Sequence, residues 1–156
     1  EVIAVDAVPA MLRLLLDAAR RDGTRNITTC RAPFRALPLG EGDVDVAVAC
    51  SSFTKHGPHG GGTALLEAER VVRPGGLIAV IWPEDPAWFR RHGFRHLRLD
   101  ADAVHHFRDV GTAERLCATY YSDDAAAWVR KRGSADVPYA VLGSEPPHDL
   151  CLKRIE

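Results

Sequence analysis

Asp6 is the first residue whose type and position suggest chemistry. It follows the apolar run Val2 to Val5, which is typical of a buried strand of a parallel sheet. Ligands of open α/β sheets bind beyond the carboxyl ends of the strands, and a carboxylate there can accept hydrogen bonds from both hydroxyls of a ribose. Asp6 therefore predicts a site for a cofactor that contains a ribose. The alternative interpretation is a solvated acid at the end of a strand.

A glycine-rich loop carries two histidines in the run Lys55-His56-Gly57-Pro58-His59-Gly60-Gly61-Gly62. Imidazoles can bind a metal or act as general bases. Two histidines supply at most two ligands and no acid or thiol is near them in the sequence, so an exposed loop is favoured over a metal site. The three glycines could cradle a phosphate, but the lysine and hydroxyl residue of a phosphate-binding loop are missing. We predict no metal.

Cysteines and aromatic residues offer weaker signals. The four cysteines are widely separated, at Cys30, Cys50, Cys117 and Cys151. This spacing favours buried, reduced thiols over a zinc site or a disulfide framework. Some aromatic side chains could wall a substrate pocket, although core packing is the more common role; they are Trp82, Trp88, Phe89, Tyr120, Tyr121 and Trp128. His105 and His106 are interpreted as surface or packing residues.

The elements that must position these residues alternate between strand and helix in the first half of the chain. We predict strands at 2–5, 27–31, 44–50 and 77–82, and helices at 9–21 and 64–72, the second ended by the turn Pro74-Gly75-Gly76. Alternating strands and helices build a mostly parallel sheet, and right-handed crossovers place helices on both of its faces.

The second half of the chain is expected to be more helical. We predict a short helix near 88–92, a strand at 96–99, and helices at 112–121 and 123–132, with Thr112 and Ser122 as N-caps and Gly133 as a stop. Segments 139–143 and 150–155 are expected to form an antiparallel C-terminal strand pair. The fold class is therefore α/β, Rossmann-like, in one domain over 1–156 with a helical insertion around 104–133.

Four ordered segments resemble the class I S-adenosylmethionine-dependent methyltransferases. They are Val2 to Leu12 (VIAVDAVPAML), Leu37-Pro38-Leu39, Asp43 to Val48 (DVDVAV) and Arg70 to Leu77 (RVVRPGGL). In that family they correspond to the second strand with its turn, the loop after the third strand, the fourth strand, and the approach to the fifth strand. The resemblance covers about residues 1 to 100, because the family's C-terminal parts vary with the substrate.

The resemblance implies S-adenosylmethionine as cofactor and methyl transfer to a small-molecule acceptor. Asp6 would hold the ribose hydroxyls, with Ala7, Pro33 and Phe34 at the adenine edge. Cys50 and Ser51 would border the methionine part and the transferring methyl. In the family, the loop with His56 borders the acceptor site, so His56 is the catalytic candidate. A dedicated base can be absent, since proximity and orientation supply much of the rate.

Two features depart from the family pattern. Pro33, beside Ala32 and Phe34, stands near the position where relatives have an acid that binds the adenine amino group. The glycine-rich turn that lets the backbone approach the cofactor is expected about twenty residues before an acid such as Asp6, but Glu1 is only five residues before it. The missing first strand would lie between the second and fourth strands, and its absence leaves two open sheet edges.

Three explanations account for the missing strand. The favoured one is that the sequence is a fragment of a longer polypeptide; the others are that a partner chain, or a homodimer, completes the sheet, or that the sheet is rearranged. Two further functions stay open: a non-catalytic methyltransferase-like subunit or regulator, and a nicotinamide-dependent oxidoreductase. The turn Arg73 to Gly76 and the antiparallel C-terminal pair make the oxidoreductase the less favoured of the two.

Composition excludes some classes of partner. Twenty basic and twenty-one acidic residues give a net charge of -1, which argues against a general electrostatic surface for nucleic acid or anionic membrane. The longest apolar runs have the length of strands and fall short of the roughly 20 residues of a membrane span or the core of a signal peptide. We therefore expect a cytoplasmic protein without nucleic acid or membrane partners.

Overall fold

A computed structural model describes residues 1–57, 60–98, 103–146 and 148–156. They form two compact units, one of Glu1–Leu97 with Asp149–Glu156 and one of Arg98–His148. None of the described helices is long and apolar enough to cross a membrane.

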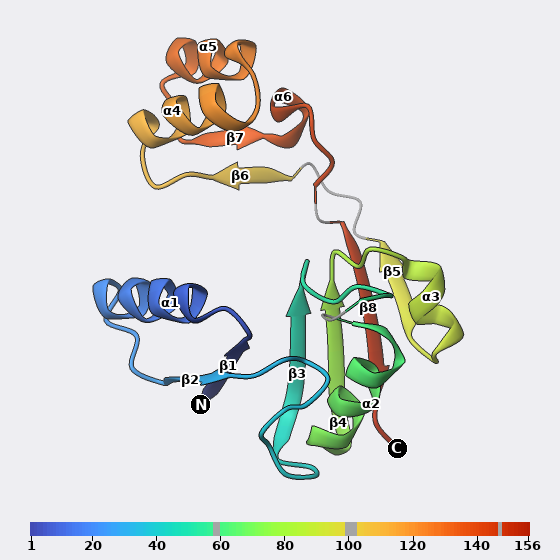
Figure 1. Cartoon of the computed structure of the whole chain (residues 1–156). Coiled ribbons are helices and arrows are strands. Elements are labelled where there is room, and N and C mark those ends of the chain that lie inside the picture. The colour runs from blue at the N-terminus through green and yellow to red at the C-terminus, as the bar shows by residue number, and fades with distance from the viewer. Residues whose placement is uncertain (58–59, 99–102, 147) are drawn as a thin grey trace. The chain divides into compact units, whose positions relative to one another are not determined.

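The first unit contains two separate pieces of sheet (Figure 1). Its elements are β1 (Val2–Asp6), α1 (Pro9–Arg21), β2 (Ile27–Arg31), β3 (Val44–Cys50), α2 (Gly61–Val71), β4 (Val72–Ile81), α3 (Pro86–Arg91), β5 (Arg95–Arg98) and β8 (Asp149–Arg154). Strands β1 and β2 pair in parallel, as their alternation with α1 predicted. The other piece has the order β3-β4-β8-β5. In it β3 and β4 are parallel, whereas β8 is antiparallel to β4.

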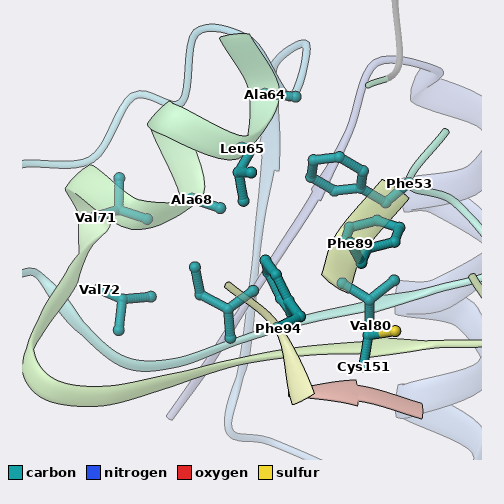
Figure 2. Packing of buried hydrophobic residues seen from close by; sticks show 11 residues of the cluster. Phe53, Ala64, Leu65, Ala68, Val71, Val72, Val80, Phe89, Phe94 and Cys151 are labelled. Carbon is teal, nitrogen blue, oxygen red and sulfur yellow. The ribbon is translucent and has the colours of Figure 1, made fainter. Parts of the chain in front are cut away.

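The main core lies where α2 and α3 pack on the second sheet piece (Figure 2). Helix α2 buries Ala64, Leu65, Ala68 and Val71 at helical spacing. They meet Ile78 and Val80 of β4, Cys151 of β8, and a group of aromatic rings. Phe89 is fully buried in that group and contacts Phe53 and Phe94 edge to face, with centroids 5.4 Å and 5.2 Å away. These contacts hold α2 and α3 on β4 and β8.

The Pro74-Gly75-Gly76 segment does not form the predicted helix-ending turn, because β4 already begins at Val72 and runs through it. Gly75 has a φ of +79°, and the pairing with β3 shifts register between Val44 and Val46. A Cβ on Gly76 would lie 2.6 Å from the carbonyl oxygen of Asp45. The glycines therefore allow an irregularity inside a strand where another backbone passes closely.

The second unit has its own small core. Its elements are β6 (Val104–His106), α4 (Val110–Tyr120), α5 (Asp123–Arg132), β7 (Asp136–Pro138) and α6 (Tyr139–Leu142). Helices α4 and α5 bury Ala113, Cys117, Ala125 and Val129 against Val137 of β7. The four cysteines were predicted to be buried thiols. Cys117 and Cys151 are buried, whereas Cys30 is half-buried and Cys50 is exposed. All four are free thiols.

Two predictions for the second half are corrected. Segment 139–143 is helix α6 and not a strand, because Pro138 ends β7 and Gly143 closes one helical turn with a φ of +65°. The antiparallel partner of β8 is therefore β4, and β7 pairs with β6 instead. The N-cap of α4 is Asp109 and not Thr112, whose backbone N–H donates to the Asp109 carboxylate at 2.7 Å. Ser122 and Gly133 cap α5 as predicted.

Candidate functional site

Asp6 lies where β1 ends, beside the end of β2. Its Oδ1 accepts a hydrogen bond from the backbone N–H of Val8 at 2.7 Å, which turns the chain into α1. Its carbonyl accepts the N–H of Ala32 at 3.2 Å, so the residues after β2 are held next to it. Within the described part of the chain, Oδ2 of Asp6 takes no hydrogen bond. The carboxylate is thus oriented by one oxygen and can accept ligand hydroxyls with the other.

Ala7, Pro33 and Phe34, which were predicted to lie beside an adenine, follow the ends of β1 and β2, but their side chains have different surroundings. Ala7 is half-buried, and its carbonyl accepts the Arg31 Nε–H at 3.4 Å. Pro33 is exposed and its carbonyl accepts the Ala36 N–H, which forms a turn. The Phe34 side chain packs against the main core cluster. Asp6, Ala7 and Pro33 therefore gather at one strand edge, while Phe34 is partly engaged in packing.

Cys50 and Ser51 lie at the carboxyl end of the neighbouring sheet piece. Ser51 has a φ of +50° and Trp82, directly after β4, has a φ of +54°. Their backbone N–H groups donate to the carbonyls of Ile81 and Asp149, at 2.9 Å and 2.8 Å. Such backbone costs about 1–3 kcal/mol in a residue other than glycine and is concentrated at functional sites. The sequence predicted Ser51 as a site residue and Trp82 as a possible pocket wall, but no periodicity could have indicated the left-handed backbone at either.

A cavity of about 270 Å³ lies at this strand edge, between the loops after β3 and β4. Its lining residues are Ser51, Phe53, Thr54, Trp82, Pro83 and Glu84. Trp82 is 44% exposed, so an indole face is available to a ligand. An aromatic wall beside a hydroxyl and a carboxylate is a common composition for a small-molecule pocket.

The histidine loop is held close to this cavity by its backbone. The Thr54 hydroxyl donates to the His56 carbonyl at 2.6 Å, and the Gly61 N–H donates to the Thr54 carbonyl. A Cβ on Gly60 would overlap that same carbonyl, so only glycine fits there. His56 itself is exposed. His59 lies outside the described residues.

Lys55 ties the histidine loop to the loop after β4. Its backbone N–H donates to the Glu84 carboxylate at 3.0 Å, and its ammonium pairs with Asp85 at 3.2 Å. The backbone N–H of Trp88 and then the Lys55 ammonium hold the pKa of the Asp85 carboxyl below its usual range. The two loops that line the small cavity are thus connected by charged hydrogen bonds, which are stronger than neutral ones.

A histidine and acid pair that the sequence did not indicate links two strands of the second sheet piece. His96 Nε2 lies 2.6 Å from Asp149 Oδ1, and both side chains are mostly buried. The two residues are 53 positions apart in the chain, so only the pairing of β8 into the sheet brings them together. Among the described residues no group of three or more His, Cys, Asp or Glu could hold a metal ion.

Comparison with known proteins identifies the class of this domain. Residues 1–76 match a family described as methyltransferase domain. The Escherichia coli (strain K12) protein YafE, described as uncharacterized, is 32% identical over 80 residues, which are 51% of this chain and 38% of that protein. Residues 1–76 thus match the methyltransferase domain family, which supports the class I S-adenosylmethionine-dependent methyltransferase domain predicted from the four segments.

Solved structures support the fold over the whole chain. The [4+2]-cyclase SpnF has a TM-score of 0.55 at 15% identity and is covered for 66% of its length by 99% of this chain. A geranyl diphosphate methyltransferase in complex with GPP and sinefungin has a TM-score of 0.50 at 14% identity, with 99% and 62% of the two chains covered. The chain therefore spans about 40% of its curated relative and less than two thirds of these structures. A likeness this distant concerns the fold alone, since one of the two proteins is a cyclase.

Proposed function

We propose that this domain takes part in methyl transfer from S-adenosylmethionine to a small-molecule acceptor. The observation that carries the proposal is Asp6, which ends a strand in the family-matched half with one carboxylate oxygen oriented by Val8 N–H and the other available. A carboxylate placed in this way can accept hydrogen bonds from a pair of ribose hydroxyls. Hydrogen bonds to charged groups contribute about 1.5–3 kcal/mol each.

The remaining candidate residues would surround the cofactor from two strand edges. Ala7 and Pro33 would edge the adenine beside Asp6, with Phe34 contributing only that part of its ring not packed in the core. Cys50 and Ser51 would border the methionine part at the end of β3. S-adenosylmethionine supplies a methyl group on a positively charged sulfur. The residues at the strand ends would bind and orient it, and the loops joined by Lys55 would limit water at the acceptor side.

His56 is proposed as the group that accepts a proton from the acceptor. Its exposed side chain lies on a loop whose backbone is fixed next to the small cavity. In the family position of that loop, an imidazole would reach the acceptor and not the cofactor. If His56 acts as a base, His56→Gln lowers kcat and removes the acidic limb of its pH profile, while cofactor affinity stays unchanged.

Titration of the intact protein with S-adenosylhomocysteine tests the proposal by calorimetry. Asp6→Ala removes two charged hydrogen bonds, so we expect the Kd to rise at least about tenfold. Asp22→Ala is the matched control, because Asp22 is an exposed acid at the other end of α1. We expect its Kd to equal that of the wild type.

The titration also separates the two functions that remain. If the folded, intact wild-type protein does not bind S-adenosylhomocysteine, the enzyme is excluded and a non-catalytic methyltransferase-like subunit or regulator is the better account. Equal affinities of the Asp6→Ala and wild-type proteins would remove Asp6 from the site while leaving the family assignment intact.

A further inference from the structure

The small cavity between the loops after β3 and β4 carries a negative charge. Among the described residues that line it, Glu84 is the only charged one, and no lysine or arginine is present. Oε2 of Glu84 accepts the Lys55 backbone N–H at 3.0 Å, but the Lys55 ammonium pairs with Asp85 instead, at 3.2 Å. In the described part of the chain the Glu84 carboxylate has no ion pair. Its charge is therefore available to a ligand.

Trp82 adds an aromatic wall to the same cavity. The side chain is 44% exposed, and its backbone has a φ of +54°. The Trp82 N–H donates to the Asp149 carbonyl at 2.8 Å, and the Asp149 carboxylate lies 2.6 Å from Nε2 of His96. A left-handed backbone is unfavourable in a residue other than glycine and persists only where the surrounding structure holds it. The indole is thus placed by the pairing of β8, although nearly half of its surface is open.

Part of the cavity wall belongs to the main core (Figure 2). Phe53 lines the cavity and packs edge to face against Phe89 in the core cluster. Pro83 is buried, while Ser51 and Thr54 add hydroxyl groups to the lining. The volume of about 270 Å³ lies just below the range of about 300–1,000 Å³ found for pockets of drug-sized ligands. The cavity therefore has space for a small molecule or for the head group of a larger one.

We infer that this cavity binds the positively charged nitrogen of a small amine ligand, between the Trp82 indole and the Glu84 carboxylate. A cation is attracted to the face of an aromatic ring, and tryptophan is the best of the three rings for this contact. An anionic ligand would be repelled by Glu84 and would find no basic residue in the described lining. Ser51 lines this cavity and is also proposed beside the transferring methyl. That the amine is the methyl acceptor rests on the proposed function, whereas its binding does not.

Calorimetric titration of the intact protein with choline tests the charge of the ligand. The probe is choline because its charge does not change with pH. The matched probe is its neutral carbon analogue, in which a tert-butyl group replaces the trimethylammonium group. We expect choline to bind at least about tenfold more tightly than the analogue, since the two differ in charge and hardly in shape. Equal Kd values, or no binding of choline, overturn the inference.

Substitutions at Trp82 test the aromatic contact. We expect Trp82→Leu to raise the Kd of choline at least about fivefold, because it removes the ring. Trp82→Phe keeps a weaker aromatic face, so its Kd should lie between those of the wild type and Trp82→Leu. The neutral analogue should not follow this order. Choline affinities that are equal in all three proteins overturn the inference.

Glu84→Gln tests the charge of the cavity without removing the oxygen that accepts the Lys55 N–H. We expect the Kd of choline to rise about fivefold or more and that of the neutral analogue to stay the same. Glu145→Gln is the matched control, because Glu145 is an exposed acid outside the cavity lining. Where a Trp82 variant does not fold, as judged by circular dichroism, this pair decides. Equal choline affinities of Glu84→Gln and Glu145→Gln overturn the inference.

S-adenosylhomocysteine separates this cavity from the proposed cofactor site. We expect choline to bind as tightly when S-adenosylhomocysteine saturates the protein as when it is absent. Competition between the two would assign the cavity to the cofactor and overturn the inference of an amine site. Binding of choline without binding of S-adenosylhomocysteine contradicts the proposed function alone. The reverse result contradicts the amine site alone.

Discussion

At the scale of single residues, charged side chains of α2 hold a neighbouring loop in place. Glu67 and Arg70 of α2 form an ion pair at 2.7 Å. Arg70 also donates to the carbonyls of Leu37 and Leu39, and Glu67 accepts the Leu37 N–H. The segment 37–39, one of those that resemble the methyltransferase family, is thus fastened to α2. The Glu67 and Arg70 side chains therefore hold the backbone of this loop in position.

The Glu67 and Arg70 pair makes stability depend on pH. The hydrogen bond from Arg70, and then that from Leu37 N–H, lower the pKa of the Glu67 carboxyl from 4.5 to about 2. A carboxyl whose pKa is lowered by folding stabilises the protein above its unfolded value, and this contribution is lost as the pH falls from about 4.5 towards 2. We expect Glu67→Gln to unfold at lower urea than the wild type at pH 7, and the difference to shrink across that interval.

Urea midpoints measured between pH 7 and 3 check the Glu67 prediction. Glu145→Gln is the control, because Glu145 is exposed in the second unit. A difference between Glu67→Gln and the wild type that stays constant with pH would mean that the ion pair has no part in the pH dependence.

At the scale of elements, caps decide where helices begin more than the apolar pattern does. In α4 the Asp109 carboxylate accepts both the N–H and the hydroxyl of Thr112, at 2.7 Å and 3.0 Å. The Thr112 N–H, then its hydroxyl, lower the pKa of the Asp109 carboxyl. Both residues are good N-caps by type, so the sequence alone could not choose between them. The backbone decides, since Asp109 is extended and Thr112 lies in the helix.

Asp109 can be tested against its closest replacement. Asp109→Ala removes the cap and is expected to cost about 1 kcal/mol of unfolding free energy, whereas Asp109→Asn keeps a capping oxygen and costs only a few tenths. Urea unfolding followed by circular dichroism measures both. Equal losses in the two variants would show that the charge, and not the cap, is what stabilises α4.

At the scale of the whole molecule, the described residues form two separate clusters of buried side chains. Phe89 is fully buried in the first unit and Val129 in the second, and each belongs to a separate cluster of buried side chains. Separate cores open with separate free energies. The candidate site residues Asp6, Ala7, Pro33, Phe34, Cys50, Ser51 and His56 all belong to the first unit, so the proposed cofactor site would depend on the stability of that unit.

Independent cores predict local effects of core substitutions. Phe89→Ala is expected to cost about 3–5 kcal/mol and to speed amide exchange in β4 and β8, with α4 and α5 unchanged. Val129→Ala should do the reverse. Hydrogen exchange read by mass spectrometry checks both. Faster exchange in both units after either substitution would show that they unfold together.

Local patterns in the sequence were enough for most elements and for the family. The strands predicted at 27–31 and 44–50 agree with the structure to the residue, because short runs rich in β-branched residues favour strands. Asp6 could be placed at a strand end for the same reason. Helical periodicity and the proline at its start predicted α1. The segment 139–143 was predicted wrongly because a run of four apolar residues does not distinguish a strand from a single helical turn.

Long-range pairing decided what the sequence could not. The insertion of β8 between β4 and β5 creates the His96 and Asp149 pair, and it supplies the carbonyl that binds Trp82 N–H. The left-handed backbone at Ser51 and Trp82, and the open edges of β1 and β3, also depend on which strands meet. The sequence by itself determined the methyltransferase family and the position of Asp6, since both are local. Tertiary structure alone decided the shape of the strand edges, because strand pairing joins residues far apart in the chain.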